Sequence, residues 1–358
     1  MTSKSASLPH NERRRSSTRA RAPLRLGIAG GGTDLSPYSD TFGGAVLNCT
    51  IDRYAYAFIE PHAGGGLAFH AKDLSRSEAF DTPDQVSRSQ LALHRGVYLR
   101  MIRDYNAGRH LPLSITTSVD APMGSGLGSS SALVIAMVEA FRDLLEVPLG
   151  QYEVAHLAFE IERIDLQLAG GKQDQYASSF GGMNFIEFLG DDRVIVNPLR
   201  VPEWIWNELE SSMVIAFTGQ SRASATIIEH QRSAMLATDS TRAIDALHQL
   251  KADAIEMKSL LLRGDIPGMG RILAKSWAAK KATSAAVSNA RIDQLYDLAV
   301  AHGAMAGKVS GAGGGGFMMF IVPPELRLDV VDALNNAGAR ASPVKFVQKG
   351  CETWRIRR

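Results

Sequence analysis

The sequence predicts an α+β fold in two domains, and three observations carry this prediction. The chain has 358 residues, enough for a substantial core and more than one domain usually holds. Strand-like and helix-like patterns are mixed in the first half, whereas long helical patterns dominate the second half. The composition changes around residues 200–212, where Pro202 and two tryptophans precede an apolar stretch. We therefore expect a disordered basic tail at 1–20, a first domain at 21–207 and a second domain at 208–358.

The first half of the chain alternates predicted strands and predicted helices. Between residues 53 and 60, aromatic residues alternate with small or aliphatic residues, which is the two-residue period of a strand. Between residues 151 and 164, apolar residues recur at spacings of three and four, which indicates one face of a helix. Gly64–Gly66 is expected to form a hairpin turn. By the same criteria we expect strands at 24–29, 45–51, 53–60, 113–119 and 183–188, and helices at 88–105, 129–145 and 151–164.

The second half begins with a short apolar strand and then becomes helical. Patterns rich in Ala, Leu and Lys run from residue 222 to residue 302 and predict long helices. A glycine loop then lies between two apolar stretches. The expected elements are strands at 213–217, 304–309 and 317–322, a helix at 324–336 and two short strands that close the chain.

The composition excludes several classes of protein. A net charge of +2 gives no reason to expect a nucleic acid or a membrane as partner. No apolar run approaches the roughly 20 residues that a membrane span needs. Cys49 and Cys351 are too few for a disulfide framework and fit a reducing cytosol. The basic run Arg13–Arg15 lacks the apolar stretch that an export signal requires next. We expect a cytoplasmic protein that binds small molecules, with a homodimer left open.

Residues 120–132 form the most informative stretch of the chain. Pro122 ends a strand, Gly124, Gly126 and Gly128 alternate along a loop, and three serines open an apolar helix. Such a loop collects free backbone N–H groups at the positive end of a helix dipole, which suits a phosphate. The plain alternative is a tight turn with glycines at positive φ and a serine N-cap. The spacing matches neither the Rossmann fingerprint nor the Walker motif, so the loop predicts a phosphate site of another kind.

Pro122–Ser130 resembles the ATP loop of the GHMP kinases, the family of galactokinase, homoserine kinase and mevalonate kinase. Residues 21–34 resemble the first motif of that family and residues 308–316 its third, in the same order along the chain. The resemblance implies the two-domain GHMP kinase fold. In that fold a ribosomal S5 domain 2-like N-terminal domain and a ferredoxin-like C-terminal domain enclose the active site. It also implies ATP as phosphoryl donor and Mg²⁺ as metal.

Phosphoryl transfer requires a phosphate cradle and a metal held by hard oxygen ligands. The resemblance implies that Ser130 and Glu162 bind the metal, with Ser131 and Glu160 as alternatives. Without the motif, Glu162 would be taken for a residue of a solvated helix face. The predicted ATP-binding residues are Gly124, Ser125, Gly126, Leu127, Gly128, Ser129, Ser130, Ser131, Gly313 and Gly314.

The chemistry also requires a group that takes the acceptor's proton. Residues 170–175 resemble a galactokinase segment whose aspartate lies against the hydroxyl that is phosphorylated, so Asp174 is the expected base. Arg25 matches the basic residue of the first motif, and it would neutralise charge that develops on the transferred group.

The acceptor is expected to be a sugar. The resemblance places Gly32, Thr33, Asp34 and Gly171 around its hydroxyls. Galactokinases carry Gly-Glu-His where this chain has Gly30–Gly32, which leaves room for an acceptor larger than galactose or oriented differently.

The motifs at 25–34, 170–175 and 218–222 most resemble those of the D-glycero-D-manno-heptose 7-phosphate kinases. Those enzymes phosphorylate the anomeric C1 hydroxyl and give the 1,7-bisphosphate on the way to nucleotide-activated heptose for capsule or lipopolysaccharide. A kinase for L-fucose or another hexose is the alternative within the family. The alternative from another class is a nucleotide sensor without catalysis, which the presence of a base and two metal ligands disfavours.

An acceptor that already carries a phosphate needs cations away from the ATP loop. Lys172 and Arg222 are the candidates, and either could instead be a structural ion-pair partner. Lys280 and Lys281 are expected on a solvated helix face.

Overall fold

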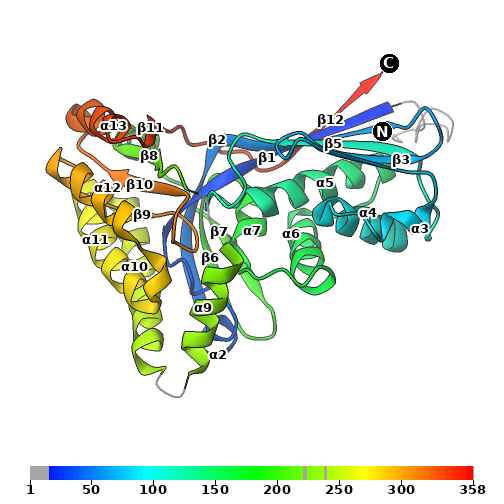
Figure 1. Cartoon of the computed structure of the whole chain (residues 1–358). Helices are drawn as coiled ribbons and strands as arrows, with labels where there is room; N and C mark the ends of the chain where they lie inside the picture. The colour runs from blue at the N-terminus through cyan, green and yellow to red at the C-terminus, as the bar shows by residue number, and fades with distance from the viewer. Residues whose placement is uncertain (1–15, 221–223, 238–239, 358) are drawn as a thin grey trace, which may run out of the picture.

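The computed structural model describes residues 16–220, 224–237 and 240–357, and these form two β-sheets with helices packed on them (Figure 1). A sheet of eight strands comes mainly from the first half of the chain, and a sheet of four strands comes from the second half. This arrangement confirms the α+β fold in two parts that the sequence predicts.

Two long antiparallel strands, β1 (Ser16–Ala29) and β2 (Gly44–Pro61), form the centre of the large sheet. The sheet runs β12-β1-β2-β5-β3-β4, and the first half of β2 also pairs with β6, which pairs with β7. The other strands of this sheet are β3 (Leu67–Ala71), β4 (Arg76–Phe80), β5 (Leu113–Val119), β6 (Met183–Phe188), β7 (Val194–Pro198) and β12 (Glu352–Arg357).

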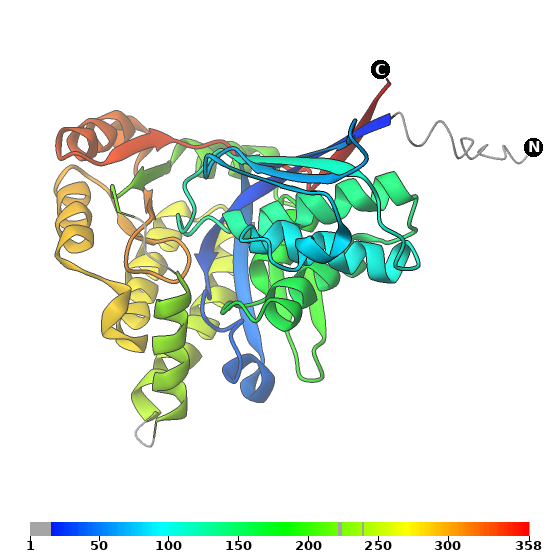
Figure 2. The ribbon, with the colours of Figure 1, turned by 45° about the vertical axis from the view of Figure 1, so that its right-hand side comes forward.

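The first and last strands differ from the prediction. β1 starts at Ser16, inside the predicted tail at 1–20, because its first residues pair with β12 on one side and, from Thr18, with β2 on the other. β12 belongs to the predicted second domain at 208–358, yet it completes the sheet of the first domain. The start of β1 and the end of β12 therefore lie at the same corner of the molecule (Figure 2).

β2 is one strand where the sequence predicts two. A register shift at Asp52 and Arg53 lets β2 continue past the polar residues that interrupt the apolar pattern. The hairpin predicted at Gly64–Gly66 is wrong. The chain does reverse direction there, but β2 and β3 pair with opposite sides of β5 and not with each other.

Four helices cover one face of the large sheet (Figure 1). The central one, α5, is buried on all sides from Ala132 to Phe141 because it contacts β1 and β2 as well as the neighbouring helices. A π-helical turn at Ile161–Asp165 extends α6. The helices are α4 (Ala92–Tyr105), α5 (Ser129–Leu145), α6 (Gln151–Glu160) and α7 (Gln173–Phe180), with short helices α2 (Tyr38–Phe42) and α3 (Pro83–Val86).

The second sheet runs β11-β8-β10-β9. A helix, α8 (Glu203–Ser211), stands where the sequence predicts only a domain boundary. The strands are β8 (Met213–Phe217), β9 (Ala306–Val309), β10 (Phe317–Ile321) and β11 (Arg340–Pro343), and the helices are α9 (Ser224–Leu236), α10 (Thr241–Arg263), α11 (Ile266–Thr283), α12 (Ala290–Ala301) and α13 (Arg327–Asn336).

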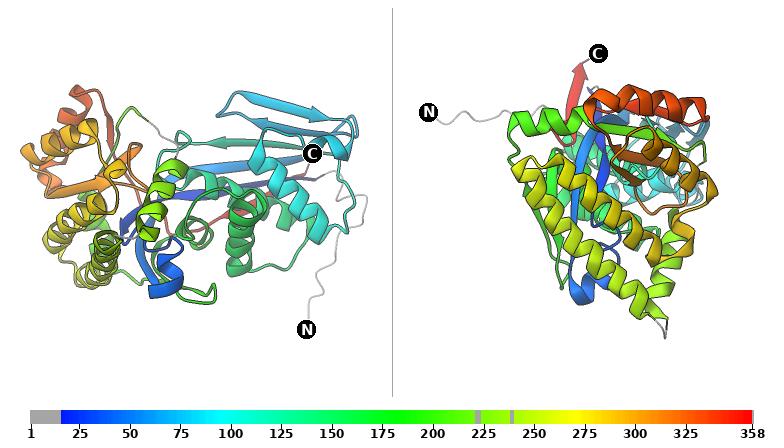
Figure 3. Two further views of the ribbon diagram at one scale, coloured as in Figure 1. Left: turned by 60° about the horizontal axis from the view of Figure 1, so that its bottom comes forward. Right: turned by 90° about the vertical axis from the view of Figure 1, so that its left-hand side faces the viewer.

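One hydrophobic core joins the two parts. The long helices α10 and α11 lie side by side (Figure 3), and both contact β1, while α10 also contacts β2. Residues of both halves, such as Leu26 and Leu47 with Met257 and Met269, belong to the same buried cluster. No helix among the described residues is long and apolar enough to cross a membrane.

Candidate active site

A cavity of about 490 Å³ lies where the glycine loop, the turn after β1 and the start of α7 meet helices α9 and α11. Its charged lining residues are three cations and three carboxylates: Arg25, Arg163, Lys280, Asp34, Glu162 and Asp174. The backbone of its glycines makes up much of the remaining wall. The cavity is therefore a polar site with balanced charges in its wall.

The loop before α5 has the conformation that its glycines predict. Gly124, Gly126 and Gly128 all have positive φ, from 70° to 79°. A Cβ at Gly126 would lie 2.2 Å from the Ser310 carbonyl oxygen, so only glycine lets the two glycine loops touch. The first N–H groups of α5 lie beside the cavity at Ser129, Ser130 and Ser131, which fits the cradle expected for a triphosphate.

Two residues of the predicted cradle turn away from the cavity. Ser125 and Leu127 are fully buried and are absent from the cavity wall. Their carbonyl oxygens accept hydrogen bonds from the backbone N–H groups of Phe317 (2.8 Å) and Arg25 (3.0 Å). These two residues fasten the loop to β10 and β1 and leave the alternate residues to face the cavity.

The third motif also faces the cavity through residues other than those predicted. Gly313 and Gly314 pack on the turn at Ala285–Val287, and the Gly314 N–H donates to the Val287 carbonyl at 2.8 Å. Gly311 and Ala312 line the cavity instead. The residues of this loop that line the cavity therefore lie two positions before the predicted Gly313 and Gly314, because the run of glycines bends away from the cavity after Ala312.

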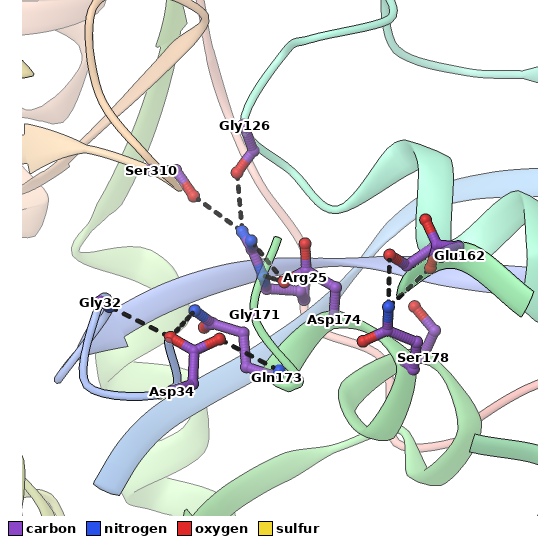
Figure 4. A network of polar contacts seen from close by, with 12 residues as sticks. Arg25, Gly32, Asp34, Gly126, Glu162, Gly171, Gln173, Asp174, Ser178 and Ser310 are labelled. Atoms are coloured by element: carbon purple, nitrogen blue, oxygen red, sulfur yellow. Dashed lines mark hydrogen bonds and ion pairs between the residues drawn. The ribbon is translucent and has the colours of Figure 1, made fainter. Parts of the chain in front are cut away.

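Arg25 and Asp174 lie together in the cavity wall, as the motifs predict (Figure 4). The Arg25 Nε and Nη2 atoms lie 2.7 Å and 2.6 Å from Asp174 Oδ1. Arg25 Nη1 donates to the Gly126 carbonyl at 2.7 Å and to Ser310 Oγ at 3.3 Å. Arg25 is almost fully buried, so its guanidinium has one fixed position between the aspartate and the loop.

The carboxylate of Asp174 lies directly against the glycine loop. A Cβ built on Gly128 would lie 3.2 Å from Asp174 Cγ, which is a tight contact. Asp174 stands in the first turn of α7 and Gly128 immediately precedes α5, so the starts of two helices converge at this point. A phosphate on the loop and a hydroxyl at Asp174 could thus be neighbours.

Glu162 is held in the cavity by the π-helical turn. Its side chain is fully buried, its Oε1 accepts from Ser130 Oγ at 3.0 Å, and its Oε2 accepts from Gln175 Nε2 at 2.6 Å (Figure 4). Gln175 Nε2 also donates to Ser131 Oγ at 3.1 Å. Glu160, the alternative, pairs with Arg100 instead.

Ser130 and Glu162 fit a Mg²⁺ site, since a hydroxyl and a buried carboxylate oxygen meet beside the loop. The nearest cation to Glu162 is Arg163, whose Nη1 lies 3.8 Å from Oε1. Within the described part of the chain, no group of three or more His, Cys, Asp or Glu could hold a metal by itself. A metal at Ser130 and Glu162 would need phosphate and water for its other ligands, which is common for Mg²⁺.

Asp34 is fixed on the opposite side of the cavity from the loop serines. Its carboxylate accepts from Gly32 N (3.1 Å), Gln173 N (3.2 Å) and Gln173 Nε2 (3.1 Å) (Figure 4). A Cβ at Gly171 would lie 1.9 Å from Asp34 Oδ2, so glycine is required there. Thr33 does not line the cavity, because its buried hydroxyl lies within 3.0 Å of Gly30 and Ala45 backbone atoms.

The predicted cations for a second phosphate do not reach the cavity. Lys172 is not part of the cavity wall, and its ammonium pairs with Asp192 and lies 4.0 Å from Asp40. The carboxylates beyond the end of β6 and in α2 thus draw Lys172 away from the cavity. Arg222 lies outside the described residues.

Lys280 lines the cavity, contrary to the prediction of a solvated face. It is 6% exposed, and its Nζ donates to the Gly31 carbonyl at 2.8 Å. The pKa of the ammonium is lowered to about 8, mainly by burial; Asp34 opposes this shift and Arg25 adds to it. The helix period could have indicated that Lys280 is buried, because Leu273, Trp277 and Lys280 are spaced so that they share the buried face of α11. Lys281 is exposed and lies 3.8 Å from Asp293.

A second buried lysine lies behind this site. Lys308 in β9 is 7% exposed, and burial, together with Lys280 and Arg25, lowers the pKa of its ammonium to about 7. The three cations are close enough to influence one another, and Arg25 alone of them pairs with a carboxylate of the described residues.

Comparison with known proteins agrees with these motifs. The family model for the GHMP kinases N terminal domain matches residues 92–182, and the model for the GHMP kinases C terminal domain matches residues 257–340. The first range contains the glycine loop, Glu162 and Asp174, and the second contains both buried lysines.

Individual relatives cover almost the whole chain. A D-glycero-α-D-manno-heptose 7-phosphate kinase of Campylobacter jejuni is 41% identical over 94% of this chain and 99% of its own length. A crystal structure described as a D-glycero-D-manno-heptose 1-phosphate kinase from Bacteroides thetaiotaomicron is 44% identical, with a TM-score of 0.80 over 95% of this chain and 99% of that one. A galactokinase of Lactococcus lactis complexed with galactose is 18% identical, with a TM-score of 0.73 over 94% of this chain and 95% of its own, and shows the fold alone.

Proposed function

Because the chain belongs to the GHMP kinase family and is a sugar kinase, we propose that its acceptor is D-glycero-D-manno-heptose 7-phosphate. The γ-phosphoryl group of ATP would pass to the anomeric C1 hydroxyl and give the 1,7-bisphosphate. The observation that carries this proposal is the contact between the phosphate loop and Asp174, where a Cβ at Gly128 would meet the carboxylate at 3.2 Å.

The loop would bind the triphosphate through the backbone N–H groups at the start of α5. Arg25, held by Asp174 and the Gly126 carbonyl, is placed to neutralise the charge that develops on the transferred group. Asp174 orients the acceptor hydroxyl and takes its proton as the bond to phosphorus forms. Bound through Ser130 and Glu162, Mg²⁺ would neutralise charge on the ATP phosphates.

The two heptose relatives have names that imply different acceptors. The Campylobacter enzyme is named for the 7-phosphate, and the Bacteroides structure is described for the 1-phosphate. Adding a phosphoryl group to C1 of the first sugar or to C7 of the second gives the same bisphosphate. We favour the 7-phosphate because the Campylobacter relative supports it and because the first motif resembles that of kinases for C1. The product would supply nucleotide-activated heptose for capsule or lipopolysaccharide.

The experiment compares heptose 7-phosphate, heptose 1-phosphate, free heptose and L-fucose as acceptors. ADP release gives the rates, and ³¹P nuclear magnetic resonance shows which carbon carries the new phosphate. We expect turnover with the 7-phosphate and a new anomeric phosphate. Asp174→Asn should lower kcat by about 10³-fold and leave ATP binding nearly unchanged.

Four results would contradict this proposal or a part of it. Faster turnover of L-fucose would favour the hexose kinase, and phosphorylation of the 1-phosphate alone would reverse the order of the two phosphates. ATP binding without turnover of any acceptor would favour the nucleotide sensor. Near-normal turnover by Asp174→Asn would remove this aspartate from the mechanism.

A further inference from the structure

We propose that Lys280 binds the phosphate group that the acceptor sugar already carries, an inference that rests on the proposed function. Of the two cations predicted for this phosphate, Lys172 is paired with Asp192 outside the cavity wall, and Arg222 lies outside the described residues. If the acceptor is a sugar phosphate, another cation must hold its far end, and the cavity wall offers few.

Of the three cations in the cavity wall, Lys280 has the most free hydrogen-bonding capacity. Arg25 bonds Asp174, Gly126 and Ser310. Arg163 bonds the carbonyls of residues 168, 169 and 171 at 3.4 Å, beside Glu162. Lys280 bonds the Gly31 carbonyl alone within the described chain, so two of the three hydrogens of its ammonium remain for a ligand.

Lys280 stands beside the turn that holds the acceptor. Its Nζ lies 3.0 Å from the position of a Cβ on Gly32, whose φ is +106°. Any larger residue at position 32 would displace the ammonium. Gly32 also donates its N–H to Asp34. The Lys280 ammonium and the Asp34 carboxylate therefore both lie against the same backbone turn. A sugar bound between Asp34 and Asp174 would therefore lie within reach of Lys280.

The charges around Lys280 suit a dianion better than a hydroxyl. No carboxylate of the described residues lies within 4.0 Å of its Nζ, although the group is buried. Lys308, buried behind it, has no carboxylate partner in the described chain either. Asp34 acts on Lys280 only from beyond 4.0 Å, so neither buried ammonium group has a direct ion-pair partner among the described residues. Such a pair of cations favours an anion of two charges, and a phosphate monoester supplies two. The serines and Glu162 that serve the ATP phosphates lie elsewhere in the wall.

The test replaces Lys280 by methionine, which keeps the volume of the side chain and removes the charge. Lys281→Met is the matched control, because Lys281 is adjacent, has the same chemistry and lies outside the cavity wall. Each protein is assayed with heptose 7-phosphate and with free heptose, and ATP is varied separately. Circular dichroism and thermal unfolding establish that both variants are folded.

We expect Lys280→Met to raise KM for heptose 7-phosphate by about 10- to 100-fold, the effect of losing a hydrogen bond to a charged group. KM for free heptose and KM for ATP should change less than about 3-fold. Lys281→Met should match the wild type in all three. Equal losses for both sugars, or a loss confined to ATP, would overturn the assignment.

Equilibrium binding separates this inference from the proposed function. Isothermal titration calorimetry with heptose 7-phosphate and mannose 6-phosphate requires no turnover. If C1 is not the site of transfer but Lys280→Met still weakens both sugar phosphates relative to Lys281→Met, the function fails and the phosphate site stands. Unchanged binding of both in Lys280→Met would overturn the phosphate site whatever the product is.

Discussion

Arg25 connects the base, the phosphate loop and the third motif through one buried guanidinium. Its Nε and Nη2 face Asp174, and its Nη1 faces the Gly126 carbonyl and Ser310 Oγ. A lysine at this position could not make these contacts together, because its ammonium is a single point. These contacts hold Asp174 and the glycine loop at a fixed spacing, which in the proposed mechanism sets the distance between the phosphoryl donor and the proton acceptor before either substrate binds.

The proposed role of Lys280 predicts a pH dependence of the acceptor preference. Burial and Arg25 lower the pKa of its ammonium to about 8, while Asp34 opposes the shift. As the pH rises through this value the ammonium loses its charge. We expect kcat/KM for heptose 7-phosphate to fall above about pH 8, whereas kcat/KM for free heptose should not. Lys280→Arg stays charged in this range, so its profile should be flat.

Lys308 is the control for this titration. Burial, Lys280 and Arg25 together lower the pKa of Lys308 to about 7, so its proton leaves at lower pH than that of Lys280. A decline centred near pH 7 that disappears in Lys308→Met would assign the profile to Lys308. If kcat/KM still declines with pH in Lys280→Arg, the decline does not come from the titration of Lys280.

The residues that the sequence predicts correctly in the cavity wall lie in contiguous motifs. Arg25, Asp174 and Ser130 could be located because each motif fixes its own geometry. The helix period of α11 could indicate that Lys280 is buried, but it could not place Lys280 in the cavity. That place depends on the packing of α11 against the turn after β1, a contact between residues 249 positions apart. Lys172 is predicted in the site but lies outside the cavity wall, because its ammonium pairs with a carboxylate 20 residues away in the sequence.

The π-helical turn at Ile161–Asp165 carries Glu162, the proposed second metal ligand. It extends α6 by one wider turn, a feature often found at functional sites. Glu162 thereby reaches Ser130 and Gln175, whereas Glu160, two residues earlier, reaches Arg100. The sequence leaves the two glutamates open because an α-helical period cannot place a residue in a turn of different width.

We expect Glu162→Gln to raise the Mg²⁺ concentration for half-maximal activity by about 10-fold or more, because a neutral amide is a weaker ligand for a hard cation. Glu160→Gln, the matched control, should leave the metal requirement unchanged. Titrating Mg²⁺ at saturating ATP measures both. An equal shift in the two variants, or no shift in Glu162→Gln, would remove Glu162 from the metal site.

The strands that the sequence misses share one cause. β3, β4 and β7 each have five residues, and β4 and β7 have mostly exposed or half-buried side chains, so no apolar pattern marks them. Their existence depends on the pairing of β3 with β5, of β4 with β3 and of β7 with β6, which is a tertiary effect. β2 was divided for a related reason, since its register shift is visible only against β1.

At the scale of the whole molecule, the two parts are joined in three ways. The glycine loops touch at Gly126 and Ser310, β12 returns from the second half to pair with β1, and one buried cluster includes residues of both halves. The active site lies at this junction, so its geometry depends on the junction being intact. We infer that the two parts fold as one cooperative unit, not as separable domains.

Deleting residues 352–358 tests this inference, because it removes β12 from the first sheet without touching the second. The deletion abolishes six backbone pairings with β1 and the contact of Arg355 with Asp143. In one cooperative unit the loss lowers the stability of both sheets together. We expect the midpoint of thermal unfolding to fall by about 5 °C in both circular dichroism and the fluorescence of Trp277, which lies in the core of the second sheet.

The measurement needs a background in which Trp277 is the sole tryptophan, with phenylalanine at positions 204, 206 and 354. The full-length protein in that background is the reference for the deletion. If the Trp277 transition keeps its midpoint while the circular dichroism transition falls or divides, the second sheet is stable without the first. The boundary would then lie close to residues 207 and 208, as the composition predicts, and β12 would be an appendage of the first sheet. Coincident shifts would instead mean that the acceptor site and the phosphate loop are held together by the stability of the entire chain.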